Sequence, residues 1–106
     1  MLSTTDRRIA QEFKQRLLSV VIPLDLRVFG SRARGDAAQD SDLDIYIEVE
    51  ELSPAQRMQI SDVAWAVGYD TDRVISTFVV TRDQLEHGSI GASPIVDHVM
   101  AEGLPI

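Results

Sequence analysis

The feature that most constrains the fold is a strict alternation of apolar and polar residues over positions 42–49. The apolar members are Leu43, Ile45, Ile47 and Val49. Side chains of a β-strand point alternately to its two faces, so this period predicts a strand with one buried face. The opposite face then carries Asp42, Asp44, Tyr46 and Glu48.

Helices and strands are predicted to alternate along the rest of the chain. Apolar residues at helical spacing favour helices over 6–21, 53–68, 81–86 and 93–103. Pro23 ends the first of these, while Ser53 and Pro54 begin the second and Gly68 ends it. Strands are predicted over 24–29 and 74–80, and a short helical turn followed by a loop over 30–41. We therefore expect an α/β (α+β) fold, a small mixed β-sheet flanked by helices, forming one domain over residues 1–106.

Charge is unevenly distributed along a chain of ordinary composition, with 44% hydrophobic and 25% charged residues. Of the net charge of −7, residues 1–34 contribute seven basic and three acidic side chains, and residues 35–106 contribute three basic and fourteen acidic ones. The positive part could meet phosphate and the acidic part a metal ion or a basic partner, although most of these charges form a solvated surface. We expect no direct binding to DNA.

Compartment and membrane association are constrained only weakly. There is no cysteine, which excludes disulfides and thiolate metal sites. No apolar run reaches the length of a membrane span, and the first residues lack the apolar stretch of a signal peptide. These features indicate a cytoplasmic protein.

Two aspartates at the start of the alternating strand are the best candidates for metal ligands. Asp42 and Asp44 are two residues apart, so both carboxylates project from the same face of the strand. Adjacent carboxylates repel each other unless a cation lies between them. Mg²⁺ in proteins is commonly held by one or two carboxylates, with substrate phosphates and water as its other ligands. The pair therefore predicts a platform for magnesium and a triphosphate.

A second group of residues, at positions 30–34, is suited to phosphate. Gly30 follows a strand and allows the backbone to approach a phosphate closely. Ser31 offers a hydroxyl and can begin a helix whose N–H groups face the anion. Arg32 and Arg34 can neutralise phosphate oxygens. Each of these features is common by itself, but their combination in this order on these elements is not.

The motifs GSRARGD at 30–36 and SDLDI at 41–45 together resemble the signature of the minimal nucleotidyltransferases of the DNA polymerase beta superfamily. The resemblance implies a polymerase-beta-like nucleotidyltransferase fold. It also implies that Gly30 and Ser31 begin the helix that cradles the β- and γ-phosphates, and that Asp42 and Asp44 bind Mg²⁺ and are catalytic. The stretch from Gly30 to Glu48, in which the signature lies, is about a fifth of the chain.

The same resemblance implies a reaction and a partner. Such a protein takes ATP with Mg²⁺ and transfers AMP to a hydroxyl. Minimal members are typically paired with a helical HEPN-domain toxin, which the nucleotidyltransferase neutralises as antitoxin. Two alternatives stay open. The first is a binding module that neutralises its partner by contact alone. The second is an enzyme that transfers to a small acceptor, but such enzymes usually carry an additional substrate domain, for which this chain has no room.

One position departs from the family pattern. Active members carry a third carboxylate on the following strand, but residues 74–80 contain none. Ser76 or Thr77 could occupy its place, and Asp70 or Asp72 could replace it if the strand begins early. Its loss is expected to lower the rate more than nucleotide binding. The chain could therefore be a weak or inactive enzyme.

Other candidate residues are weaker. His87 and His98 have no metal-ligand spacing and are expected on helix surfaces. Trp65 is expected in the core or at an interface rather than under a nucleobase. Tyr46 and Glu48 share the strand face of the two aspartates, so they are weaker candidates to line the site.

Overall fold

The structure is a computed structural model of the whole chain, and it describes residues 2–36, 38 and 41–106. Its elements follow the predicted order, with a 3₁₀ helix and a short last strand in addition. They are α1 (Thr4–Leu17), β1 (Asp25–Phe29), α2 (Gly30–Arg34), β2 (Leu43–Val49), α3 (Pro54–Thr71), β3 (Ile75–Thr81), α4 (Arg82–His87), η1 (Ser89–Ala92), α5 (Pro94–Glu102) and β4 (Leu104–Pro105). The predicted loop up to Ser41 includes positions 37, 39 and 40, which lie outside the described residues.

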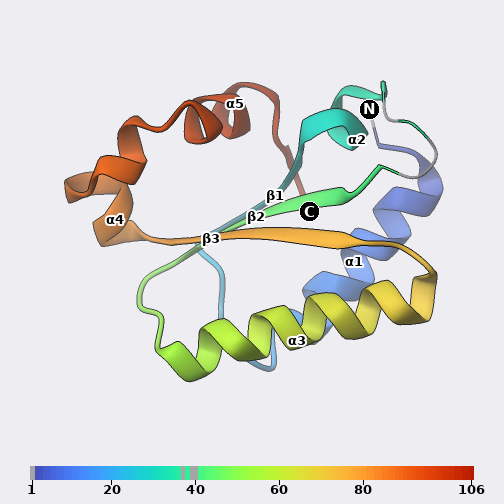
Figure 1. Cartoon of the computed structure of the whole chain (residues 1–106), viewed down its shortest axis with the longest axis horizontal. Helices are drawn as coiled ribbons and strands as arrows, with labels where there is room; N and C mark the ends of the chain where they lie inside the picture. The colour runs from blue at the N-terminus through green and yellow to red at the C-terminus, as the bar shows by residue number, and fades with distance from the viewer. Residues whose placement is uncertain (1, 37, 39–40) are drawn as a thin grey trace.

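The four strands form one mixed sheet in the order β3-β2-β1-β4. β2 is parallel to β3, whereas β1 is antiparallel to both β2 and β4. Figure 1 shows α1 and α3 on one side of the sheet and α2, α4 and α5 on the other. The predicted mixed sheet flanked by helices is thus confirmed. Within the part of the chain that the structure describes, no helix is long and apolar enough to cross a membrane.

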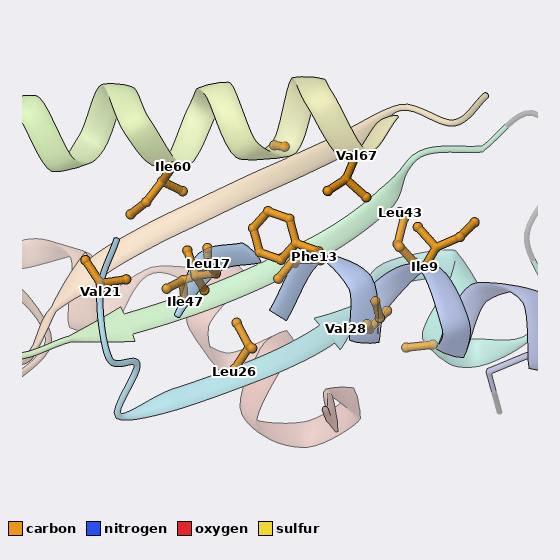
Figure 2. Packing of buried hydrophobic residues seen from close by; sticks show 14 of the residues in the cluster. Ile9, Phe13, Leu17, Val21, Leu26, Val28, Leu43, Ile47, Ile60 and Val67 are labelled. Carbon is orange, nitrogen blue, oxygen red and sulfur yellow. The ribbon is translucent and has the colours of Figure 1, made fainter. Parts of the chain in front are cut away.

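The main core lies between the sheet and the pair α1 and α3. The alternating residues of β2 point into it, as predicted, and Leu43, Ile45 and Ile47 are fully buried there. Figure 2 shows Phe13 and Leu17 of α1 packed between this face and α3. Burying large apolar side chains in this way supplies most of the free energy that orders the sheet.

The second face of β2 is also covered, which the alternation did not predict. Tyr46 is completely buried in a smaller apolar cluster with Val80 and Val99. Leu85 of α4 packs against that cluster. Helices therefore shield both faces of the sheet, and the expectation of one buried face was incomplete.

Two predicted helix ends were wrong. α1 stops at Leu17 rather than Val21, because Val21 packs in the core from an irregular segment that leads to Pro23. α3 continues past Gly68 to Thr71, and its left-handed cap is Asp72 with φ 56°. A Cβ on Gly68 would lie 2.5 Å from the Arg73 carbonyl oxygen, so this glycine serves a close backbone approach rather than a cap.

Candidate functional site

The candidate site lies where β1 passes into α2, beside the start of β2. The sheet register sets Phe29, the last residue of β1, opposite Asp44. The same register sets Asp44 opposite Ser76 of β3. Paired residues of neighbouring strands point to the same face. The turn into α2, the aspartate pair and Ser76 therefore form a row across one end of the sheet, on the side of α2 (Figure 1).

Gly30 makes the closest approach in this row. Its φ is +75°, a conformation that residues other than glycine adopt with difficulty. A Cβ at this position would lie 2.5 Å from Asp44 Oδ2. The backbone at the start of α2 thus lies directly against the Asp44 carboxylate, and only a glycine leaves this space.

The two aspartates are close enough to influence each other. Burial, and next the charge of Asp42, raise the pKa of the Asp44 carboxyl, while the charge of Arg34 opposes this rise. Asp42 is exposed, and its Oδ2 accepts a hydrogen bond from the Ser76 hydroxyl at 3.0 Å. The site therefore holds a half-buried carboxylate beside a second one, an arrangement that a bound cation would relieve.

Arg34 lies at the open side of the site. Its Nη1 is 3.2 Å from Glu102 Oε2 and its Nε is 3.3 Å from Asp36 Oδ2. The hydrogen bond to Glu102, followed by that to Asp36, raises the Arg34 pKa. The side chain is 45% exposed, and ion pairs of such exposed groups are weak. Its guanidinium could exchange them for a phosphate at small cost.

Arg32, in contrast, is held inside the structure. Its Nε and Nη2 donate to the Ser41 carbonyl at 3.2 and 2.8 Å. Its Nη1 lies 3.5 Å from Asp6 Oδ2, and Arg73 Nη1 lies 2.9 Å from Asp6 Oδ1. Asp6 is only 3% exposed. Arg32 thus fixes the residue before Asp42, and a direct phosphate contact would require it to leave these partners.

Sequence reasoning missed this buried arrangement. The helical pattern makes Asp6 only the first residue of a predicted helix, and it predicts no role for Arg73. Three different segments bring Asp6, Arg32 and Arg73 together: the first turn of α1, α2, and the residues before β3. No local pattern in the sequence signals such a contact.

The structure does not bring Asp70 or Asp72 to the aspartate pair. Asp70 lies in α3 and pairs with Arg16 at 2.8 Å, and Asp72 caps the same helix. Among the described residues, no group of three or more His, Cys, Asp or Glu side chains could hold a metal ion. Ser76 occupies the position on β3 beside the pair, whereas Thr77 stands opposite Ile45 on the other face.

The remaining candidates lie away from the open site. Burial raises the pKa of Tyr46 to about 12, with a smaller contribution from Glu48, and the Tyr46 hydroxyl is buried without a hydrogen-bond partner among the described residues. Glu48 lies 3.7 Å from Arg82. His87 and His98 are exposed on helices, as predicted. Trp65 is 71% exposed, so the core position considered for it was wrong.

Comparison with known proteins identifies the family of this chain. The model of the family "Nucleotidyltransferase domain" matches residues 6–93, which include every residue of the candidate site. A search of the curated proteins finds no match.

Solved structures share the fold. A structure assigned as a minimal nucleotidyltransferase aligns with a TM-score of 0.64 and 24% identity over 100% of this chain and 97% of that one. A mutant of the toxin–antitoxin MntA-HpeT aligns with a TM-score of 0.57 and 16% identity over 94% and 70%. A toxin–antitoxin crystal structure with AMP-PNP aligns with a TM-score of 0.57 and 22% identity over 88% and 68%. The sequence match, the shared fold and the row from Gly30 to Ser76 agree, and this chain belongs to the nucleotidyltransferase domain family.

Proposed function

We propose that this chain is a Mg²⁺-dependent nucleotidyltransferase that transfers AMP from ATP to a hydroxyl group of a partner protein. The observation that carries the proposal is the contact between the turn at Gly30 and the Asp44 carboxylate, where a Cβ would lie 2.5 Å from Oδ2. It sets a backbone that can approach phosphate beside a carboxylate pair that can hold a metal ion.

Asp42 and Asp44 are the proposed Mg²⁺ ligands. The pair fits this cation, because Mg²⁺ takes one or two carboxylates and fills its shell with phosphate oxygens and water. Burial, and next the charge of Asp42, raise the pKa of Asp44, and a bound cation would favour its charged form. Bound Mg²⁺ would polarise the phosphate that is attacked and neutralise the charge of the leaving pyrophosphate.

The residues around the aspartate pair would bind the phosphates and orient the nucleotide. Gly30 and Ser31 would receive the β- and γ-phosphates, and Arg34 would neutralise them from the open side. Arg32 remains a candidate for this contact, although its bonds to Ser41 favour a positioning role for it. Ser76 holds Asp42 through a hydrogen bond of 3.0 Å. This set orients the nucleotide, which is the main task of the protein in phosphoryl transfer.

In the proposed reaction, the acceptor oxygen forms a bond to the α-phosphorus while the bond from that phosphorus to the β-phosphate oxygen breaks. Pyrophosphate leaves, and the proton of the hydroxyl passes to water. Residues 75–81 of β3 offer no carboxylate to receive this proton. Transfer is therefore expected to be slow compared with that of a family member that carries a third carboxylate.

The proposed partner is a helical HEPN-domain toxin, which this chain would neutralise as antitoxin. Two observations support a protein partner. Two of the structures that share the fold are toxin–antitoxin proteins, one of them with AMP-PNP. In addition, the segment 35–106 carries fourteen acidic and three basic residues, which complements a basic, RNA-cleaving protein.

A second candidate is neutralisation by contact alone. The observation that favours it is Ser76, a hydroxyl at the position beside the aspartates where active members carry a carboxylate. In this case, nucleotide binding would persist while transfer would be absent.

The deciding experiment is incubation with ATP labelled in the α-phosphate, together with a small helical protein encoded next to this chain. Label on the partner, a mass increase of one AMP, and no label from γ-labelled ATP would support transfer. The matched control is the Asp42→Asn, Asp44→Asn variant, which should not transfer label to the partner. Suppression of the partner by a stable complex without label would replace the proposal with the second candidate.

A further inference from the structure

Three large apolar side chains are exposed together along one face of α3. Met58, Trp65 and Tyr69 are 69%, 71% and 76% exposed, and their spacing sets them on one side of the helix. The rings of Trp65 and Tyr69 are stacked, with centroids 5.5 Å apart and planes at 15°. Apolar groups gathered in this way, rather than scattered, are typical of an interaction surface.

A hollow of about 900 Å³ lies beside this aromatic pair, between α3 and β3. Ala64, Trp65 and Tyr69 line it from the helix, and Ile75 and Thr77 line it from the strand. The exposed row on α3 therefore borders a concave surface.

The edge of β3 runs along this hollow and has unpaired backbone groups. Among the described residues, β3 is paired on one side only, with β2. Leu43 donates to the Val74 carbonyl, and a parallel ladder uses alternate residues. Ile75, Thr77 and Val79 therefore turn their N–H and C=O groups outward. The strand also has no charged residue, although charges are the usual protection of an edge.

Two carboxylates border this surface. Asp62 lies within the exposed row on α3, and Asp72 lines the hollow. No described basic side chain forms an ion pair with either of them. Arg73 also lines the hollow, but it pairs with Asp6 at 2.9 Å. A ligand with cationic side chains would meet these carboxylates and the faces of two aromatic rings.

We propose that this surface, formed by Met58, Asp62, Trp65 and Tyr69 of α3 with the outer edge of β3, docks an extended segment of the acceptor protein. The segment adds to β3 as a further strand. On its side that faces α3 it carries apolar side chains, which fill the hollow, and basic ones, which meet Asp62 and Asp72. Strand addition of this kind obtains affinity from backbone bonds and specificity from side-chain pockets.

The location of the surface connects it with the proposed reaction, on which this inference rests. The hollow reaches Ser41 and Ile75, which immediately precede Asp42 and Ser76 in the chain. A segment bound along β3 would thus lead to the aspartates, and a hydroxyl at its end could reach the nucleotide. The surface would select the acceptor, while the row from Gly30 to Ser76 would hold the nucleotide.

The test uses a short synthetic peptide without aromatic residues, in which every second residue is threonine and the positions between are valine and lysine in turn, so that valine and lysine share one face. In the control, called the valine–glutamate peptide, glutamate replaces lysine. Trp65 is the one tryptophan of the chain, so its fluorescence reports on the surface directly. Saturable binding is expected for this peptide and none for a valine–glutamate peptide. In hydrogen exchange by NMR, the amides of Ile75, Thr77 and Val79 should become protected on binding, whereas those of Ser76 and Phe78 should not change.

Matched variants separate the surface from general effects. Tyr69→Ala and Asp62→Asn should each weaken peptide binding by about fivefold. Ile22→Ala, at a site that is 82% exposed, and Asp97→Asn on α5 should leave it unchanged. Equal binding of the glutamate peptide, no protection of the outward β3 amides, or a dimer through β3 that excludes the peptide would overturn the proposal.

The two proposals can fail separately. Peptide binding needs neither ATP nor Mg²⁺, so it should persist in the Asp42→Asn, Asp44→Asn variant. Binding without any transfer to a partner would leave the docking surface standing and overturn the transferase. If transfer to the partner is unaffected by Tyr69→Ala and Asp62→Asn and the peptide does not bind, the transferase would stand and the docking surface would be overturned.

Discussion

The Ser76 hydroxyl donates a hydrogen bond of 3.0 Å to Asp42 Oδ2 across the parallel pair of β2 and β3. Ser76 also lies opposite Asp44 in the register, whereas Thr77 lies opposite Ile45 and faces the other side. The strand position nearest to both aspartates is therefore filled by a group that orients one carboxylate but cannot take up a proton at neutral pH.

Replacement of Ser76 by aspartate should supply the carboxylate that β3 lacks. Ser76→Asp would add a carboxylate beside the aspartates, and we expect it to raise the rate of AMP transfer by roughly tenfold or more. Thr77→Asp is the matched control, since the same change one residue later points to the opposite face and should not raise the rate. The measurement is the initial rate of partner labelling from α-labelled ATP. Equal rates for both variants would show that Ser76 does not stand in for a carboxylate.

The role of Gly30 can be tested against a second glycine with the same backbone conformation. Gly30 and Gly35 have φ of 75° and 81°, so an alanine at either position should cost about 1 kcal/mol of unfolding free energy or more. Only at Gly30 does the new Cβ meet Asp44. Gly30→Ala should therefore be the more destabilising in urea unfolding and should weaken ATP binding in calorimetry, whereas Gly35→Ala should retain the affinity. Equal effects on ATP affinity would contradict the close-approach assignment.

Substitution of Arg32 should mainly lower stability, whereas substitution of Arg34 should mainly weaken nucleotide binding. Arg32→Ala removes two bonds to Ser41 and one partner of the buried Asp6, and it should lower the free energy of unfolding by about 2–4 kcal/mol. Arg34→Ala removes exposed pairs, and it should change stability by less than ~1 kcal/mol but weaken ATP binding. Urea unfolding and calorimetry measure both quantities. Loss of ATP affinity with unchanged stability for Arg32→Ala would show that Arg32 binds phosphate directly.

The elements that sequence periodicity predicts are those whose signal is local. The alternation of 42–49 predicted β2 and its buried core side, and Ser53 with Pro54 predicted the start of α3. Ser53 and Gln56 form a capping box there, a contact between residues three positions apart. Such contacts are encoded within one turn of the chain and can be read without knowledge of the fold.

What the sequence did not predict depends on distant segments. Gly68 is typical of a helix end, but α3 continues to Thr71 and the glycine instead leaves room for the Arg73 carbonyl. β4 has only two residues, too few for any periodicity, and it exists because β1 offers it an edge. For the site, the motif predicted Gly30 beside the aspartates, whereas the choice of Ser76 over Thr77 needed the register of β2 and β3.

The pair Asp42 and Asp44 predicts a link between stability, pH and magnesium. The folded state raises the pKa of Asp44 above its ordinary value of 3.8, so folding favours the protonated carboxyl. The stability that this gives is present below the ordinary pKa and is lost as the pH rises through the raised one. At pH 7 the charged Asp44 is therefore a cost to the fold. Asp44→Asn should raise Tm by a few degrees at pH 7, and the difference should shrink as the pH falls below the raised pKa.

Magnesium should act on the wild type in the same direction as the substitution. A cation held by Asp42 and Asp44 compensates their repulsion, so Mg²⁺ should raise the wild-type Tm at pH 7 and leave that of Asp44→Asn unchanged. Asp62→Asn, which removes an exposed carboxylate of α3, is the control and should keep the wild-type response to Mg²⁺. Thermal unfolding followed by circular dichroism across the pH range, with and without Mg²⁺, measures all three proteins. An Asp44→Asn variant could be less stable than the wild type at pH 7, or could respond to Mg²⁺ as the wild type does. Either result would show that the pair is a structural contact and not a metal site. The reason is that the repulsion between two uncompensated carboxylates is removed both by neutralising one of them and by binding a cation.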